Sequence, residues 1–245
     1  MPAGPQFPPL LTGYPAPEGT RILPRAVKGA VAGKLGAGDI VWRANPERME
    51  FALVLEPEVD RQRCYEMLFV TMVALGDALG AICPPEVAVT YGWPSSLLMN
   101  GADVGAVALA MAEGADESAP DYLVAGVHVE MRPALSDPNP GMDKDRTTLW
   151  DEGCGEVSSG ALLESAARHL VNWIHNWSED GFKPVHEAWW GRIDEKTRLS
   201  RALPAQDGEL VGLDAQGNGL IKTAVATRLF EIADGLAQAE RKGGS

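Results

Sequence analysis

The sequence predicts an α+β fold, because strand-like runs follow one another without intervening helices and two long helical patterns stand apart from them. The strand-like runs are densest between residues 86 and 131, and the helical patterns cover residues 61–82 and 158–177. With 245 residues, 45% hydrophobic and 22% charged, the chain can form one sizeable domain, or a main domain with a small appendage. We therefore expect a mainly antiparallel sheet packed with helices.

The first 20 residues predict an extended arm. They contain Pro2, Pro5, Pro8, Pro9, Pro15 and Pro17. Because proline lacks an amide donor, this density disfavours a helix or a central strand. Apolar side chains along the arm are expected to anchor it to the body: Phe7, Leu10, Leu11 and Tyr14.

The first long helix is predicted after Asp60, once two short strand-like runs, Asp39–Arg43 and Glu50–Glu56, have passed. Apolar residues then recur at steps of three and four, which places them on one helix face and predicts a core helix. These residues are Cys64, Met67, Leu68, Thr71, Leu75, Ala78, Leu79 and Ile82.

An antiparallel run of strands is predicted next. Glu86–Tyr91 alternates like a strand, and Leu97–Met99 leads into Asn100-Gly101, a strong hairpin signal because both residues tolerate positive φ. Val104–Met111 is the returning strand. After a polar loop, Asp121–Met131 is a further long apolar strand.

The second long helix is expected to begin near Ser158, whose hydroxyl suits an N-cap, and to end before Gly181. Its apolar face would carry Leu163, Ala166, Leu170, Trp173, Ile174 and Trp177. From Ala205 the pattern changes to three short strands around Gly-containing turns, at 209–214, 220–223 and 228–232. These predict a small barrel-like β domain at the C-terminus.

Charge and cysteine content exclude several classes of protein. The formal net charge of −13 argues against a nucleic-acid surface, because phosphate binding depends on clusters of Lys and Arg. We recognise no secretory signal and no uninterrupted apolar stretch long enough to cross a bilayer, so no membrane partner is expected. Three widely spaced cysteines, Cys64, Cys83 and Cys154, fit neither a disulfide framework nor a zinc site. We expect a cytoplasmic protein without a bound metal.

The segment Tyr91–Val107 resembles the core of the biotin and lipoate protein ligase family. In that family a strand ending in Lys-Trp-Pro-Asn-Asp passes through Leu-Leu and a turn into Lys-Val-Gly-Gly, and the first lysine holds the acid and the adenylate phosphate. Here Gly92 precedes Trp93-Pro94, Ser95-Ser96 replaces Asn-Asp, and Asp103 replaces the second lysine. The resemblance therefore implies the fold and leaves the activity to be argued separately.

The resemblance extends over most of residues 20–235. Matching segments in the family's order include Gly38–Val41, Phe51–Leu55, Gly126–Val129, Thr148–Gly153 and the small C-terminal β domain. It implies a mixed, mainly antiparallel sheet with helices. We divide the chain into an arm (1–20), a ligase-like domain (21–200) and a small β domain (201–245).

The family's phosphate cradle is missing. Ligases close over acid and nucleotide with a loop reading Gly-Arg-Gly-Arg-x-Gly-Arg-x-Trp, whereas Val41–Met49 joins two strands almost directly and keeps Arg43 and Arg48 as candidate cations. Each lost donor to a developing charge costs about 2.7 to 4 kcal/mol of transition-state stabilisation. No DNA-reading helix pair is recognised at the N-terminus, so the chain is not expected to be a repressor.

The resemblance implies a ligand site for a small carboxylic acid or its adenylate. Its expected lining is Trp93, Pro94, Ser95, Ser96, Gly105, Ala106 and His128, with Arg43 and Arg48 as cations. We expect binding without conversion. An active ligase or acyltransferase using ATP, Mg²⁺ and biotin, lipoate or octanoate is one alternative. A non-catalytic interaction protein, which forms a homodimer or docks a biotinyl or lipoyl acceptor domain, is the other.

Two side chains are weak candidates for catalysis. Cys154-Gly155 resembles the acyl-accepting cysteine of the related octanoyl transferases, and it would need a pKa lowered by a cation or by the helix that follows Ser158. His128 and Glu130 share a strand face and could form a base with its orienting partner. A structural histidine is the alternative, and we favour it.

Overall fold

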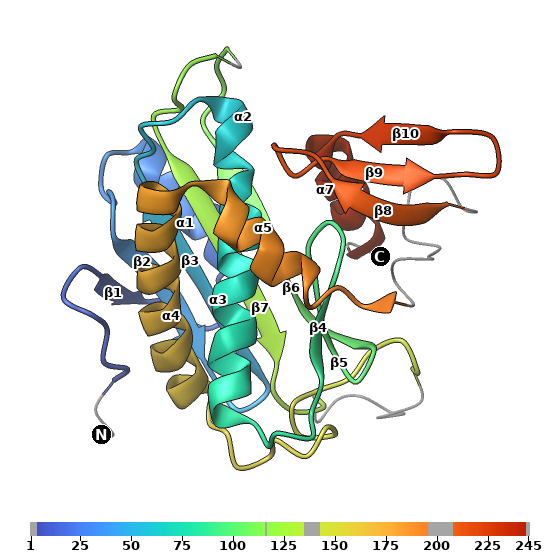
Figure 1. The fold of residues 1–245 in the computed structure, drawn as a ribbon. Helices are drawn as coiled ribbons and strands as arrows, with labels where there is room; N and C mark the ends of the chain where they lie inside the picture. Colours follow the sequence, from blue (N-terminus) through green and yellow to red (C-terminus); the bar gives the residue numbers. More distant parts are fainter. Residues whose placement is uncertain (1–3, 116, 135–142, 196–207, 244–245) are drawn as a thin grey trace.

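A seven-stranded sheet forms the middle of the protein, with helices on both of its faces (Figure 1). The structure is a computed structural model that describes residues 4–115, 117–134, 143–195 and 208–243. The strand order is β1-β2-β3-β7-β6-β5-β4. In chain order the strands are β1 (Thr12–Pro15), β2 (Asp39–Ala44), β3 (Arg48–Leu55), β4 (Val89–Gly92), β5 (Ser96–Met99), β6 (Ala102–Met111) and β7 (Leu123–Glu130).

The sheet is mixed and mainly antiparallel, as predicted. β1 runs parallel to β2, and the other neighbouring pairs are antiparallel. β1 belongs to the Pro-rich arm and occupies a sheet edge, where Pro15 is tolerated. Two expected anchors of the arm are wrong, because Leu10 is 74% exposed and Tyr14 is 38% exposed. Phe7 packs against Trp42 as an anchor should.

The predicted hairpin is confirmed. β5 and β6 are joined at Asn100 and Gly101, whose φ angles are 50° and 85°. Two successive positive φ angles give the turn the twist of the flanking strands, which is why Asn-Gly is a strong hairpin signal. β4, β5, β6 and β7 then follow one another antiparallel without a helix between them.

Three helices cover one face of the sheet: α3 (Glu66–Ile82), α4 (Ser159–Asp180) and α5 (Phe182–Trp190). Short α2 (Arg61–Cys64) leads into α3, and the Asp60 side chain accepts the Arg63 amide at its start. The N-cap of α4 is Ser158, which accepts the Ala161 amide, and the helix ends before Gly181, both as predicted.

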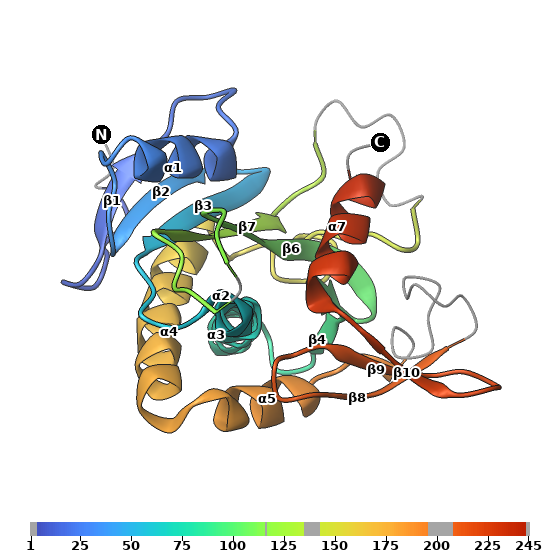
Figure 2. The same cartoon turned by 90° about the horizontal axis from the view of Figure 1, so that it is seen from above.

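The core helix α3 is buried on more sides than the predicted single stripe. Leu68, Phe69 and Val70 are consecutive and all fully buried. The helix lies between the sheet on one side and α4 and α5 on the other, so it has no broad face toward solvent (Figure 2).

Arg61–Ile82 is the stretch of the described residues that most resembles a membrane span, although Arg61, Arg63, Glu66 and Asp77 interrupt its apolar residues. By length and composition these residues would suffice. Most of the stretch is buried inside the fold, which is the usual situation of a core helix.

The opposite face of the sheet carries α1 (Ile22–Val31) and α7 (Ile232–Gly243) (Figure 2). Neither helix was predicted. Arg21 precedes α1 without a side-chain capping bond, so the usual start signal is missing from the sequence. α1 packs through Ile22 and Ala26 onto the strand residues Val41, Ala52 and Val54.

The C-terminal part contains a three-stranded antiparallel sheet in the order β10-β9-β8, as predicted. Its strands are β8 (Glu209–Leu213), β9 (Gly219–Lys222) and β10 (Thr227–Phe230). Ile232 was expected to end the last strand, but it is the first residue of α7. The proposed domain boundary at 200/201 lies outside the described residues, so the division of the chain stays a prediction.

Candidate functional site

A cavity lies on the α1 and α7 face of the sheet, and the strand register explains its floor. Glu50 of β3 is opposite His128 of β7, which is opposite Ala106 of β6. In the row two residues away, Gly126 of β7 is opposite Ala108 of β6. Because alternate strand residues share a face, small side chains gather over two adjoining strands and leave space above them.

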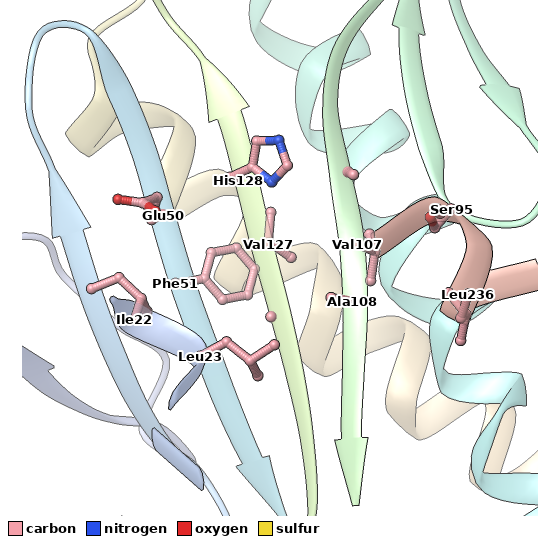
Figure 3. A pocket seen from close by; sticks show the side chains of 13 residues that line it. Ile22, Leu23, Glu50, Phe51, Ser95, Val107, Ala108, Val127, His128 and Leu236 are labelled. Carbon is pink, nitrogen blue, oxygen red and sulfur yellow. The ribbon is translucent and has the colours of Figure 1, made fainter. Parts of the chain in front are cut away.

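Two helices and a strand-end segment complete the walls (Figure 3). Ile22 and Leu23 come from the start of α1, Leu236 and Ala239 come from α7, and Ser95 precedes β5. The volume of the cavity is about 390 Å³, within the range of about 300 to 1,000 Å³ of small-molecule sites. The lining is apolar except for Glu50 and His128 at one end and Ser95 near Leu236.

The two candidate cations are engaged by carboxylates. Arg43 forms an ion pair with Glu50 and donates to the Thr20 carbonyl oxygen at 2.9 Å. Arg48 forms an ion pair with Glu130 and lies 3.9 Å from Glu50. Both arginines line a more open hollow of about 680 Å³ that adjoins the cavity and shares Glu50 with it. Their positive charge at this mouth is therefore largely compensated.

His128 is neutral at pH 7. Burial lowers its pKa, and the nearby Arg48 guanidinium lowers it further, against the opposing effect of Glu130 and Glu50. Glu130 was expected to orient His128. In the structure Glu130 instead forms an ion pair with Arg48. A neutral imidazole in the lining can donate or accept one hydrogen bond.

Trp93 and Pro94 lie away from the cavity lining. Trp93 is 5% exposed, and its indole nitrogen donates to the Gly217 carbonyl oxygen at 3.3 Å. The indole ring packs against Gly219 and Gly235 of the C-terminal part, and the Trp93–Pro94 peptide bond is cis. The ring therefore fixes the C-terminal part to the sheet, in place of the expected role as a pocket wall.

Ser96 and Gly105 have local structural roles. The Asp103 carboxyl group accepts the Gly105 amide at 3.1 Å. Burial raises the pKa of Asp103 to about 6, against the lowering effect of Ser96, the Gly105 amide and Arg146. At Gly105 a Cβ atom would collide with the His128 carbonyl oxygen. Glycine is thus required by the close approach of β6 to β7, and not by a ligand.

Cys154 lacks the property that an acyl acceptor needs. The side chain is 2% exposed, and burial raises the pKa of its thiol. Its neighbour is the thiol of Cys83, whose pKa is also raised by burial. The lowered pKa expected from a cation or from the start of α4 is contradicted. Among the described residues, no group of three or more His, Cys, Asp or Glu side chains has an arrangement suited to a metal ion.

Of the predicted lining residues, the structure brings Ser95, Ala106 and His128 to the cavity. The sequence interpretation missed the following lining residues: Ile22, Leu23, Glu50, Phe51, Val107, Ala108, Gly126, Val127, Leu236 and Ala239. For Ala108 and Gly126 a signal existed, because each lies two positions from a predicted lining residue on the same strand. The helix residues carry no such signal.

Comparison with known proteins agrees with the geometry. A model of the biotin/lipoate A/B protein ligase family matches residues 7–191. The match covers well over half of the chain, so the chain belongs to the biotin/lipoate A/B protein ligase family.

Among individual relatives, a biotin–acetyl-CoA-carboxylase ligase of Paracoccus denitrificans is 26% identical over 188 residues, which are 74% of this chain and 77% of the relative. A crystal structure of a biotin protein ligase-like protein of unknown function from Silicibacter sp. TM1040 superimposes with a TM-score of 0.86 and 34% identity, covering 95% of this chain and 99% of that one. Biotin protein ligase from Aquifex aeolicus has a TM-score of 0.65 at 17% identity, covering 84% of this chain and 89% of that one, which shows the fold alone.

The residues at the cavity mouth do not fit the polyphosphate of ATP. A phosphate there would meet the carboxylates of Glu47 and Glu50 as well as the guanidinium groups of Arg43 and Arg48. The β2–β3 connection also contains Pro46, which has no amide to offer a phosphate oxygen.

Proposed function

We propose that this protein binds a small carboxylic acid with an apolar body in the cavity between α1 and α7, and that it does not activate the acid. The single observation that carries the proposal is the contrast within one site. The apolar cavity is open above Ala106, Ala108 and Gly126, while the cations at its mouth are neutralised by Glu50 and Glu130.

The orientation of the acid follows from the lining. Its apolar body would lie against the small side chains of β6 and β7, where burial of each CH₂ group contributes about 0.8 kcal/mol. Its carboxylate would lie at the Glu50 and His128 end, because His128 can donate a hydrogen bond there and Arg43 compensates the charge of Glu50. Biotin, lipoate and octanoate are the acids to test, since the family acts on acids of this class.

Thermal unfolding with each acid tests this proposal. A ligand at a hundred times its Kd stabilises the folded state by about 2.7 kcal/mol, which raises the Tm of a protein of this size by about 5 to 10 °C. Ala108→Phe would fill the cavity and abolish the shift. Val225→Phe, at a side chain that is 90% exposed, is the matched control and should leave the shift intact. If none of the three acids shifts the wild type, the proposal is wrong.

The second candidate, an active ligase, is favoured by the similarity to the Paracoccus ligase. Its test is incubation with ATP, Mg²⁺, each acid and a biotinyl or lipoyl acceptor domain, followed by intact-mass measurement of the acceptor. We expect no mass increase. A modified acceptor lysine would establish ligation and overturn the non-activating part of the proposal.

The third candidate is an interaction protein that pairs with a second copy or docks an acceptor domain. Light scattering after size-exclusion chromatography, with and without the acceptor domain, measures both associations. Association without any acid-dependent Tm shift would favour this candidate over the first two.

A further inference from the structure

The helix α7 is joined to the C-terminal sheet by a buried side chain. The Asn218 carboxamide, in a residue 7% exposed, accepts the Ile232 amide at 3.0 Å and donates to Asp214 at 2.9 Å. Ile232 itself is 3% exposed. The first turn of α7 is therefore fixed to the turn between β8 and β9.

A second contact fixes the first turn of α7 to the main sheet. A Cβ atom at Gly235 would lie 2.7 Å from the tip of the Trp93 ring, so glycine allows the helix to approach the indole. The same indole donates to Gly217. Because Trp93 is two residues before Ser95 in the cavity wall, α7 is positioned relative to the cavity by a short, packed connection.

Beyond this fixed turn, α7 forms one side of the cavity, where Figure 3 shows Leu236. Leu236 and Ala239, three residues apart and hence on one helix face, line it. Ile22 and Leu23 of α1 line the cavity from the other helix on this face. The α7 wall offers hydrocarbon side chains, so it can discriminate ligands by size and shape.

We propose that Leu236 and Ala239 are specificity-determining residues that set the length of the apolar body of the bound acid. This proposal rests on the acid-binding function proposed above. It narrows the class of ligands to unbranched or compact acids whose apolar end reaches α7. Leu236 and Ala239 act by contact with the ligand and have no part in a chemical step.

The test is the binding of hexanoate, octanoate, decanoate and dodecanoate to the full-length protein by isothermal titration calorimetry. In Leu236→Ala, the acid that binds tightest should be longer than in the wild type. In Ala239→Leu, it should be shorter. Each methylene that gains or loses burial should change the relative affinity by about fourfold.

Two control variants keep α7 but change residues away from its cavity wall. Ala237→Leu adds the same side chain as Ala239→Leu, and Asp234→Ala shortens an exposed side chain of the first turn. Both should keep the wild-type order of affinities. Leu236→Val serves as a milder change if Leu236→Ala does not fold.

The outcomes separate the two proposals. If the wild type binds the acids and the α7 variants keep its chain-length order, the role of α7 is overturned and acid binding stands. If the wild type binds none of the acids, both proposals are overturned. Opposite shifts in the two α7 variants support both.

Discussion

The face of the central sheet toward α3 and α4 carries large apolar side chains throughout. The face toward α1 and α7 carries valines under α1, but small or titratable residues at the cavity. Along β3, Phe51 packs into the main core and borders the cavity, while its neighbour Glu50 lies at the polar end of the cavity. Along β7, Val127 and Val129 belong to the same core, and His128 lies between them. The two faces therefore differ in packing: one stabilises the fold, and the other leaves room for a ligand.

The largest expected effect compares one residue type on the two faces. Leu75→Ala, in the filled core, should lower the free energy of unfolding by about 2 to 5 kcal/mol, because it leaves a cavity in close packing. Leu236→Ala, beside an existing cavity, should cost about 1 kcal/mol or less, because its neighbours on that side are already missing. Urea denaturation measures both. Equal losses would break the comparison.

A second pair of variants compares two glycines. Gly105→Ala should destabilise by about 1 to 3 kcal/mol, since its Cβ would push β6 from the His128 carbonyl of β7. Gly80 lies on an exposed turn of α3 with no atom near its Cβ position, so Gly80→Ala should stabilise by about 0.4 to 1 kcal/mol. The same urea titration applies. A neutral Gly105→Ala would show that β6 and β7 can separate without cost.

A third prediction concerns Asp103 and the pH dependence of the free energy of unfolding. Burial raises the pKa of Asp103 to about 6, so the folded protein binds this proton more tightly than the unfolded chain. The stability from this group is fully present below about pH 4 and is lost as the pH rises through about 6. The free energy of unfolding of Asp103→Asn should therefore be higher than that of the wild type by about 1 to 2 kcal/mol at about pH 8. Below about pH 4 the two free energies should be equal. A constant difference between the two proteins across this range would contradict the argument.

The smallest expected effect concerns ligand binding. Burial lowers the pKa of His128, so the imidazole is neutral in the free protein at pH 7. A carboxylate beside it would raise that pKa, and proton uptake would strengthen binding as the pH falls, by at most about tenfold per pH unit. Calorimetry in buffers of different ionisation enthalpy reports the proton directly. His128→Gln should bind with a flat pH profile, and an equally steep profile in this variant would exclude His128 as the group that titrates.

The elements predicted correctly carry local signals. The Asn100-Gly101 hairpin and the Ser158 cap each require only residues close in sequence, since turn dihedrals and capping bonds are local. α1 was missed because Arg21 gives no capping signal. α7 was missed because its start depends on Asn218, which is 14 residues away.

The site was predicted in part, for a related reason. Ser95, Ala106 and His128 lie on or beside the strands that carry the family resemblance, and the structure brings them to one cavity. Trp93 lies two residues before Ser95, yet it packs on Gly235 of the C-terminal part. Its environment depends on a segment more than a hundred residues away, which spacing along the chain does not report.

The sequence by itself determined the α+β class, the antiparallel strand run and the residue types at the cavity mouth, because periodicity, turn chemistry and residue identity are local properties of the chain. Tertiary structure decided which cations are compensated and which surfaces enclose the cavity. Arg48 meets Glu130 across 82 positions, and α7 meets the sheet beside Trp93. Such pairings arise from packing of distant elements, so the charge of the site and the dimensions of the cavity are properties of the folded chain.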